Sequence, residues 1–185
     1  MIFDKLLVRR TITLGTATLA VASVLAGCAT PGVVGDPALA ASVAGTRISE
    51  VEVDQAVRVV VDKLQVQPVR ARPLVLTVLV RAAQSERVAA ERQIVISDAQ
   101  RRAALASAPD LAPLYSTPEG TSFADKFATE VVLTQALGET QLAQACAVYP
   151  VVLNPRYGQW STTAWALEGS TGSLSSAAPR ASASR

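Results

Sequence analysis

The 185-residue chain contains no histidine, only two cysteines and few aromatic side chains. The absence of histidine excludes serine or cysteine nucleophiles activated by an imidazole, and every zinc site with a histidine ligand. The sequence also lacks a glycine loop of the kind that cradles phosphate and a carboxylate cluster of the metal-binding kind. We therefore expect no enzyme activity, no cofactor and no metal site.

A basic start and a short apolar run make up the N-terminal part of the chain. Lys5, Arg9 and Arg10 precede an apolar, small-residue stretch over residues 11–26. This stretch is shorter than the ~20 apolar residues that a membrane-spanning helix needs. The pattern is typical of a secretory signal peptide, which we predict over residues 1–27. The arginine pair leaves twin-arginine export open as an alternative to general secretion.

The apolar run ends on the sequence Leu25-Ala26-Gly27-Cys28. It resembles the bacterial lipobox, in which a lipid donor alkylates the cysteine thiol and the cysteine becomes the first mature residue. The resemblance implies that Cys28 carries diacylglycerol and anchors the chain to the extracytoplasmic face of the cell membrane. Two acyl chains are enough for stable anchoring. The alternatives are an ordinary secretory signal with an unrelated cysteine, or an uncleaved helix.

The chain that follows residue 27 is long enough for one domain with its own core. Its positive and negative charges balance, because residues 1–27 carry the excess of basic side chains. This balance gives no support for electrostatic binding of nucleic acid. With Cys28 lipidated, Cys146 has no partner for an intramolecular disulfide. Its apolar neighbours predict a buried thiol, and a reactive or intermolecular cysteine is the alternative.

Composition divides this mature chain into three segments. Residues 28–39 are small and interrupted by proline and glycine, which predicts a flexible tether between lipid and domain. Residues 169–185 are rich in serine and alanine and are predicted to be a disordered tail. The folded domain is therefore expected over residues 40–168.

Local signals predict the first elements of this domain. Residues 41–48 form a predicted hairpin in which Gly45 supplies the positive φ of the turn. Ser49 stands at a helix N-cap position, and Glu52 three residues later completes a capping-box pattern. The helix that follows has apolar residues at helical spacing and is expected to end before Gln67.

The middle of the domain is predicted to be helical around a central, buried helix. This helix is expected to begin at Pro73, because proline suits a first helical position, and to be buried, because its first half is apolar nearly all round. A second capping-box pattern at Ser97 opens a short helix, and the prolines over residues 109–118 predict a loop. In the next helix Phe123 faces the core and Glu130 faces away.

The last part of the domain is predicted to be extended, with a turn over residues 154–158. The fold class expected from these elements is mainly α with a small β element (α+β), in which the N- and C-terminal extended segments come together in one sheet.

Two stretches carry a resemblance to a known family. "VAGTRISEVEVDQAV", at residues 43–57, resembles the opening of SurA-like and PrsA-like chaperones. "VVLNPRYGQW", at residues 151–160, resembles the closing segment of lipoproteins with a SurA N-terminal-like domain. Ala44 departs from the asparagine usual at that position. The resemblance implies a SurA N-terminal-like helical domain that binds unfolded exported polypeptides without ATP. The chain has no room for the parvulin isomerase domain of many relatives, so no isomerase activity is expected.

The second stretch supplies the candidate structural or binding residues Arg156, Tyr157 and Trp160. The two aromatic side chains either bind a partner or pack against the start of the domain. Arg156 either pairs with a carboxylate or ligand, or makes a hydrogen bond that stabilises the turn. The function expected from the sequence is a lipid-anchored, extracytoplasmic chaperone-like protein. The alternative is a structural or interaction lipoprotein of the cell envelope with one dedicated protein partner.

Overall fold

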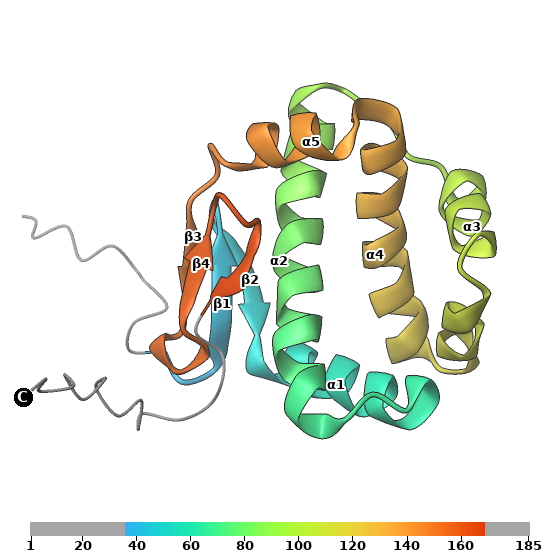
Figure 1. Cartoon of the computed structure of the whole chain (residues 1–185), viewed down its shortest axis with the longest axis vertical. Coiled ribbons are helices and arrows are strands. Elements are labelled where there is room, and N and C mark those ends of the chain that lie inside the picture. The colour runs from blue at the N-terminus through green and yellow to red at the C-terminus, as the bar shows by residue number, and fades with distance from the viewer. Residues whose placement is uncertain (1–35, 169–185) are drawn as a thin grey trace, which may run out of the picture. The chain divides into compact units, whose positions relative to one another are not determined.

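The computed structural model describes residues 36–168. Over this range the protein is mainly helical with small antiparallel sheets, so the predicted α+β class is confirmed (Figure 1). The predicted signal peptide, Cys28, the predicted tail over residues 169–185 and most of the predicted tether lie outside the described residues. None of the helices in the described range is long and apolar enough to span a bilayer.

The first sheet joins the two ends of the described chain. Strand β1 (Leu39–Val43) lies between β2 (Thr46–Ser49) and β3 (Val151–Leu153), and both pairs are antiparallel. Ala44 and Gly45 both have positive φ, as a two-residue hairpin turn between right-twisted strands requires. The structure also extends the folded segment beyond the predicted boundary at residue 40, because Leu39 is buried in β1.

Helix α1 (Glu50–Leu64) begins at the predicted cap. The Oγ of Ser49 accepts a hydrogen bond from the backbone N–H of Glu52 at 3.1 Å. The carboxylate of Glu52 instead pairs with the Nζ of Lys126 at 2.9 Å. The predicted capping box is therefore only half formed, and its acidic member connects α1 to a later helix.

Helix α2 (Pro68–Glu91) begins five residues earlier than predicted, so Pro73 lies inside the helix. A proline there leaves the carbonyl oxygen four residues earlier, on Val69, without its helical partner. Val69 is 79% exposed, so water can satisfy that carbonyl and the helix tolerates the proline. The earlier start adds a turn that carries Arg72.

The remaining helices are α3 (Asp98–Ala106), the 3₁₀ helix η1 (Pro109–Ser116), α4 (Pro118–Leu137) and α5 (Glu139–Cys146). Ser97 and Gln100 form the complete capping box predicted at the start of α3. The loop predicted over residues 109–118 is wrong, because η1 occupies most of it and Pro118 starts α4. Gly138, with φ of 83°, separates α4 from α5.

The C-terminal segment closes the fold with a hairpin that the sequence patterns did not predict. The turn after β3 contains the 3₁₀ helix η2 (Pro155–Tyr157), and β4 (Gln159–Ser161) then pairs with β5 (Ala166–Glu168). Trp165, just before β5, is buried.

Helix α2 is central, as predicted, and stands between the sheets and α4 (Figure 1). It packs against α1, α4, α5 and β1. The fully buried side chains of its middle are Val75, Leu76, Leu79 and Val80. Burial on most of its circumference explains why its apolar pattern has no single clear stripe.

A polar cluster lies inside this core. The guanidinium of Arg81 on α2 pairs with Glu130 on α4 at 2.9 Å and lies 4.0 Å from the ring centroid of Trp165. The prediction that Glu130 faces away from the core is wrong, because α4 is flanked by α2 on one side and by α3 and η1 on another. Burial raises the pKa of Glu130 above its ordinary value, although Arg81 opposes the shift.

Gln84 connects the same cluster to the C-terminal segment. Its Oε1 accepts from the indole N–H of Trp165 at 2.8 Å, and its Nε2 donates to the carbonyls of Cys146 and Tyr149. Cys146 is fully buried, as predicted, and burial raises the pKa of its thiol to about 11. A protonated, enclosed thiol is a poor nucleophile.

Candidate functional site

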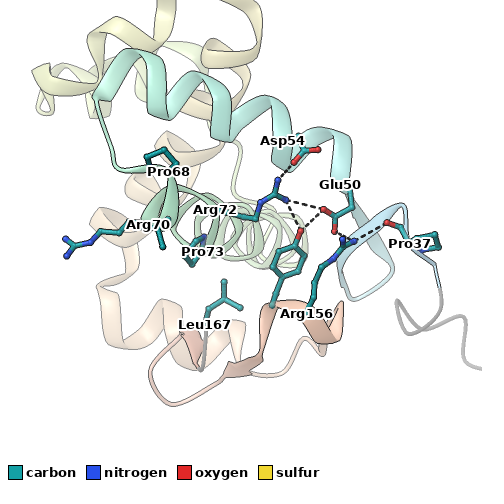
Figure 2. Close-up of a pocket in the computed structure, with 11 residues that line it drawn as sticks. Pro37, Glu50, Asp54, Pro68, Arg70, Arg72, Pro73, Arg156 and Leu167 are labelled. Atoms are coloured by element: carbon teal, nitrogen blue, oxygen red, sulfur yellow. Dashed lines mark hydrogen bonds and ion pairs between the residues drawn. The ribbon is translucent and has the colours of Figure 1, made fainter. Parts of the chain in front are cut away.

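An open pocket of about 1090 Å³ lies where the first turns of α1 and α2 meet the C-terminal segment (Figure 2). Four other pockets among the described residues have smaller volumes, of about 50 to 450 Å³. We call the first, larger pocket the terminal pocket. Its lining residues are Pro37, Glu50, Asp54, Pro68, Val69, Arg70, Arg72, Pro73, Arg156, Tyr157 and Leu167.

One side of the terminal pocket is apolar. Pro68, Val69 and Pro73 come from the first turns of α2, and Leu167 comes from β5. Two prolines within six residues expose ring carbons there, and Val69 projects almost entirely into solvent. These four residues form the apolar side of the pocket.

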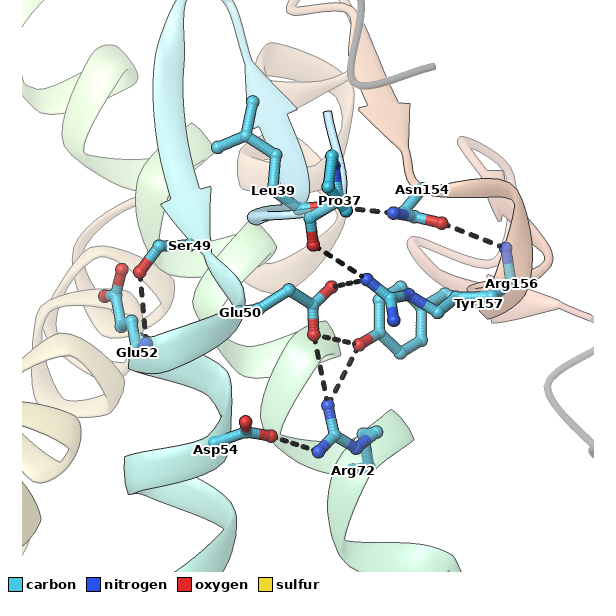
Figure 3. A network of polar contacts seen from close by, with 10 residues as sticks. All are labelled: Pro37, Leu39, Ser49, Glu50, Glu52, Asp54, Arg72, Asn154, Arg156 and Tyr157. Carbon is cyan, nitrogen blue, oxygen red and sulfur yellow. Dashed lines mark hydrogen bonds and ion pairs between the residues drawn. The ribbon is translucent and has the colours of Figure 1, made fainter. Parts of the chain in front are cut away.

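The other side is a network of hydrogen bonds centred on Glu50 (Figure 3). Its Oε1 accepts from the Nη2 of Arg156 at 2.8 Å. Its Oε2 accepts from the hydroxyl of Tyr157 at 2.5 Å and from the Nη1 of Arg72 at 3.3 Å. The side chain of Glu50 is only 15% exposed, and both of its carboxylate oxygens accept hydrogen bonds from neighbouring side chains.

Arg72 joins two of the acidic residues of α1, Glu50 and Asp54. Glu50 and Asp54 are four residues apart and therefore lie on the same face of the helix. Arg72 donates to both of them and to the hydroxyl of Tyr157, the last at 2.9 Å. Burial lowers the pKa of Arg72, but the hydrogen bonds to Asp54 and Tyr157 outweigh it and the pKa is raised. Arg72 therefore stays charged at any physiological pH.

The C-terminal residues of the network also hold the start of the described chain. Arg156 donates to the carbonyl oxygen of Pro37 at 3.2 Å, and the Nδ2 of Asn154 donates to the carbonyl oxygen of Leu39 at 3.1 Å. Burial raises the pKa of Tyr157, and its hydrogen bond to Glu50 acts in the same direction. Tyr157 therefore remains a neutral donor near pH 7.

This arrangement suits binding. The side chains whose pKa values are shifted, Arg72 and Tyr157, keep their ordinary protonation states at neutral pH, so neither is adapted to transfer a proton. Residues 36–168 hold no group of three or more His, Cys, Asp or Glu side chains suited to a metal ion. The pocket offers an apolar side beside fixed charged donors and acceptors, which is the usual composition of a ligand site.

The structure brings two of the three predicted binding residues together. Arg156 and Tyr157 lie in the wall of the terminal pocket, and both contact Glu50 at the start of α1. Trp160 lies elsewhere, in β4, beside a smaller pocket of about 450 Å³. Its Nε1 is buried without a hydrogen-bond partner in the described structure. Cys28 lies outside the described residues, so its lipidation stays a prediction.

Sequence reasoning missed Glu50, Asp54 and Arg72 as members of the site. The spacing of the two acids on one helical face was a signal that could have identified them. Arg72 was missed because the predicted start of α2 at Pro73 placed it outside the helix. Its partners lie 18, 22 and 85 residues away in the sequence, and no local pattern indicates such contacts.

Comparison of the chain with protein-family models, curated proteins and solved structures found no match. The basis for a functional assignment is therefore the terminal pocket, its network and the two stretches of sequence that meet there.

Proposed function

We propose that this protein is a lipid-anchored, extracytoplasmic, chaperone-like protein that binds extended segments of exported polypeptides without ATP and without isomerase activity. Its site is the terminal pocket. The anchor is the diacylglycerol on Cys28, and the domain is of the SurA N-terminal-like kind that the two sequence stretches resemble.

The observation that carries this proposal is the composition of the terminal pocket. Its volume of about 1090 Å³ is slightly above the roughly 300–1,000 Å³ typical of small-molecule sites. An open site of this size can accept several residues of an extended chain. The apolar side can bury a client side chain, and the exposed guanidinium of Arg156 can bind a client carbonyl or carboxylate.

The meeting of the two resembling stretches supports the domain type. Glu50 belongs to the first stretch, and Arg156 and Tyr157 belong to the second. Hydrogen bonds join them directly, and β1 pairs with β3 beside them. Two stretches about 100 residues apart in the sequence are thus parts of one structural unit, as the resemblance implies.

The test is suppression of aggregation of a reduced model substrate, measured by light scattering without ATP. The full chain should suppress aggregation at stoichiometric amounts. Val69→Asp should weaken the effect, because it places a charge on the apolar side of the pocket. Val95→Asp is the matched control, since Val95 is 86% exposed and lies outside the pocket. Suppression that is absent, or equally weakened in both variants, would contradict the proposal.

Two further measurements separate the other parts of the proposal. Refolding limited by proline isomerisation should proceed at an unchanged rate in the presence of the protein. Labelled fatty acid should be incorporated into the unmodified chain and not into Cys28→Ala. An accelerated refolding rate would contradict the absence of isomerase activity, and an unlabelled chain would contradict the lipid anchor. Neither result would bear on the binding of polypeptides by the terminal pocket.

The second candidate is an envelope lipoprotein with one dedicated protein partner. The distribution of exposed apolar side chains favours it, because a broad client surface is expected to gather them. Within residues 36–168 the large exposed ones are Val51, Val69, Leu74, Val95, Tyr115, Val148 and Val152, and of these Val69 alone lines the terminal pocket. Crosslinked complexes purified from membranes should contain one dominant partner on this candidate and a broad mixture of exported proteins on the first.

A further inference from the structure

We infer that the mouth of the terminal pocket faces the bilayer to which the chain is anchored, so that its residues contact phospholipid headgroups and polypeptides enter the pocket at the membrane surface. This orientation rests on the lipid anchor proposed above. It adds which face of the domain meets the membrane.

The first described residues are fixed to the rim of the pocket. Pro37 is one of its lining residues, and its carbonyl oxygen accepts from Arg156 (Figure 3). Asp36 accepts from the backbone N–H of Ala38 at 3.0 Å and pairs with Arg47 at 2.6 Å. A chain that arrives from Cys28 therefore enters the described domain beside the pocket.

The length of that chain limits how the domain can turn. From Cys28 to Asp36 a fully extended backbone spans at most about 29 Å. Helix α2 has 24 residues and is about 36 Å long, with the pocket at its N-terminal end. To turn over, the domain would need α2 to fit between the pocket rim and the bilayer. The tether is too short for that, so the far end of α2 cannot become the end nearest the membrane.

The side chains at the mouth suit a headgroup layer. Val69 is exposed, and the guanidinium of Arg70 points away from the network into solvent (Figure 2). Arg156 is also exposed on the rim. Guanidinium groups bind phosphate well, and a single apolar side chain beside them can enter the interfacial region. The tether supplies the proximity, and these contacts select the face.

The experiment uses the full lipidated chain reconstituted in vesicles that contain nitroxide-headgroup lipid. A fluorophore is attached to Val69→Cys or, as the matched control, to Val95→Cys beyond the other end of α2. Cys146 should not react, because it is buried and protonated. We expect about twofold or stronger quenching at position 69 than at position 95, because about 36 Å of helix separates the two ends.

An insertion of about 12 Gly/Ser residues between positions 30 and 31 is the second arm, because it raises the reach of the extended tether from about 29 Å to about 72 Å. The longer tether should reduce the difference in quenching between positions 69 and 95. Equal quenching with the unmodified tether, or stronger quenching at position 95, would overturn the orientation and leave the anchor intact. Failure of the unlabelled chain to float with vesicles would instead overturn the anchor itself, and the orientation with it.

Discussion

Helix α2 carries two arginine–carboxylate clusters in contrasting surroundings. Arg72, near its start, joins Glu50 and Asp54 at the edge of an open pocket, and its side chain is 38% exposed. The side chain of Arg81, two and a half turns later, is 26% exposed and pairs with Glu130, which is 8% exposed against 15% for Glu50. Both oxygens of Glu50 are hydrogen-bonded, whereas the Oε2 of Glu130 has no partner in the described structure.

The difference separates a cluster that can exchange partners from one that fixes packing. At the pocket edge, water or a ligand can replace a lost hydrogen bond, so each contact contributes little to stability. In the core, a charge that loses its partner stays desolvated, which is strongly unfavourable. We therefore expect substitutions in the Arg81 cluster to change stability, and substitutions in the Arg72 cluster to change binding.

The largest effect is expected from Trp165→Ala. The indole is buried, covers the guanidinium of Arg81 and donates to Gln84, so its removal leaves a cavity, uncovers Arg81 and deprives the Oε1 of Gln84 of its hydrogen bond. We expect a loss of about 3–5 kcal/mol in the free energy of unfolding, measured by urea denaturation. Trp165→Phe, which keeps an aromatic ring and loses the N–H, should cost less. A loss below about 1 kcal/mol for the alanine variant would show that this cluster does not fix packing.

Glu130→Ala should have the next largest effect. It leaves Arg81 without its ion pair, and we expect a loss of about 3 kcal/mol. The value lies at the low end for a buried pair because the Arg81 side chain keeps 26% exposure and contacts Trp165. The double variant Arg81→Met with Glu130→Leu should have a free energy of unfolding close to that of the unmodified protein, because both charges are removed together. A double variant as unstable as the single one would contradict this interpretation.

A smaller effect is expected in the pH dependence of the free energy of unfolding, and the pKa of Glu130 sets its direction. Burial raises the pKa of Glu130 above its ordinary 4.5, so the folded state holds this proton more tightly than the unfolded state. The resulting stabilisation is fully present below 4.5 and is lost as pH rises through the folded pKa, by at most about 1.4 kcal/mol for each pH unit. The difference in unfolding free energy between the protein and Glu130→Gln should change with pH in this direction. If this difference in unfolding free energy stays constant with pH, Glu130 does not hold its proton more tightly in the folded state.

Tyr157→Phe tests the Arg72 cluster at the edge of the terminal pocket. The variant keeps the ring and removes a hydroxyl that donates to Glu50 and accepts from Arg72. We expect a loss of only about 1 kcal/mol, because the two partners keep each other and one side of the network meets solvent. The variant should remain folded but suppress aggregation less well than the unmodified protein, because Tyr157 lies in the wall of the terminal pocket. A loss as large as that of Glu130→Ala would remove the distinction between the clusters.

The sequence predicted those elements whose signals are local. Gly45 marked the hairpin turn, and Ser49 and Ser97 marked the two helix starts, because each acts on backbone groups within three residues. Ala44 also adopts positive φ, although an alanine does so at a cost. The start of α2 was not predicted, because Pro68 and Pro73 both suit a first helical turn and the local sequence does not decide between them.

Long-range features could be predicted only in part. Arg156 and Tyr157 were identified through the resemblance of their stretch, yet their partner Glu50 was not. The burial of Glu130 depends on which helices flank α4, and its charge alone favoured the solvent face. The terminal pocket combines three segments of the chain, so its existence depends on tertiary packing that no local pattern contains.

Arg156→Ala should have the smallest effect on stability. The side chain is half exposed, and its ion pair with Glu50 competes with water, so we expect a loss of under about 1 kcal/mol. Its bond to the carbonyl of Pro37 fixes the entry of the tether, so the variant should still narrow the quenching difference between positions 69 and 95. Arg101→Ala is the matched control, because it removes an ion pair to Asp98 within α3 and changes no residue of the tether entry or the terminal pocket. If Arg156→Ala changes stability by several kcal/mol and leaves the quenching difference unchanged, then the network at the pocket belongs with the buried cluster, and the contrast between the two ends of α2 fails.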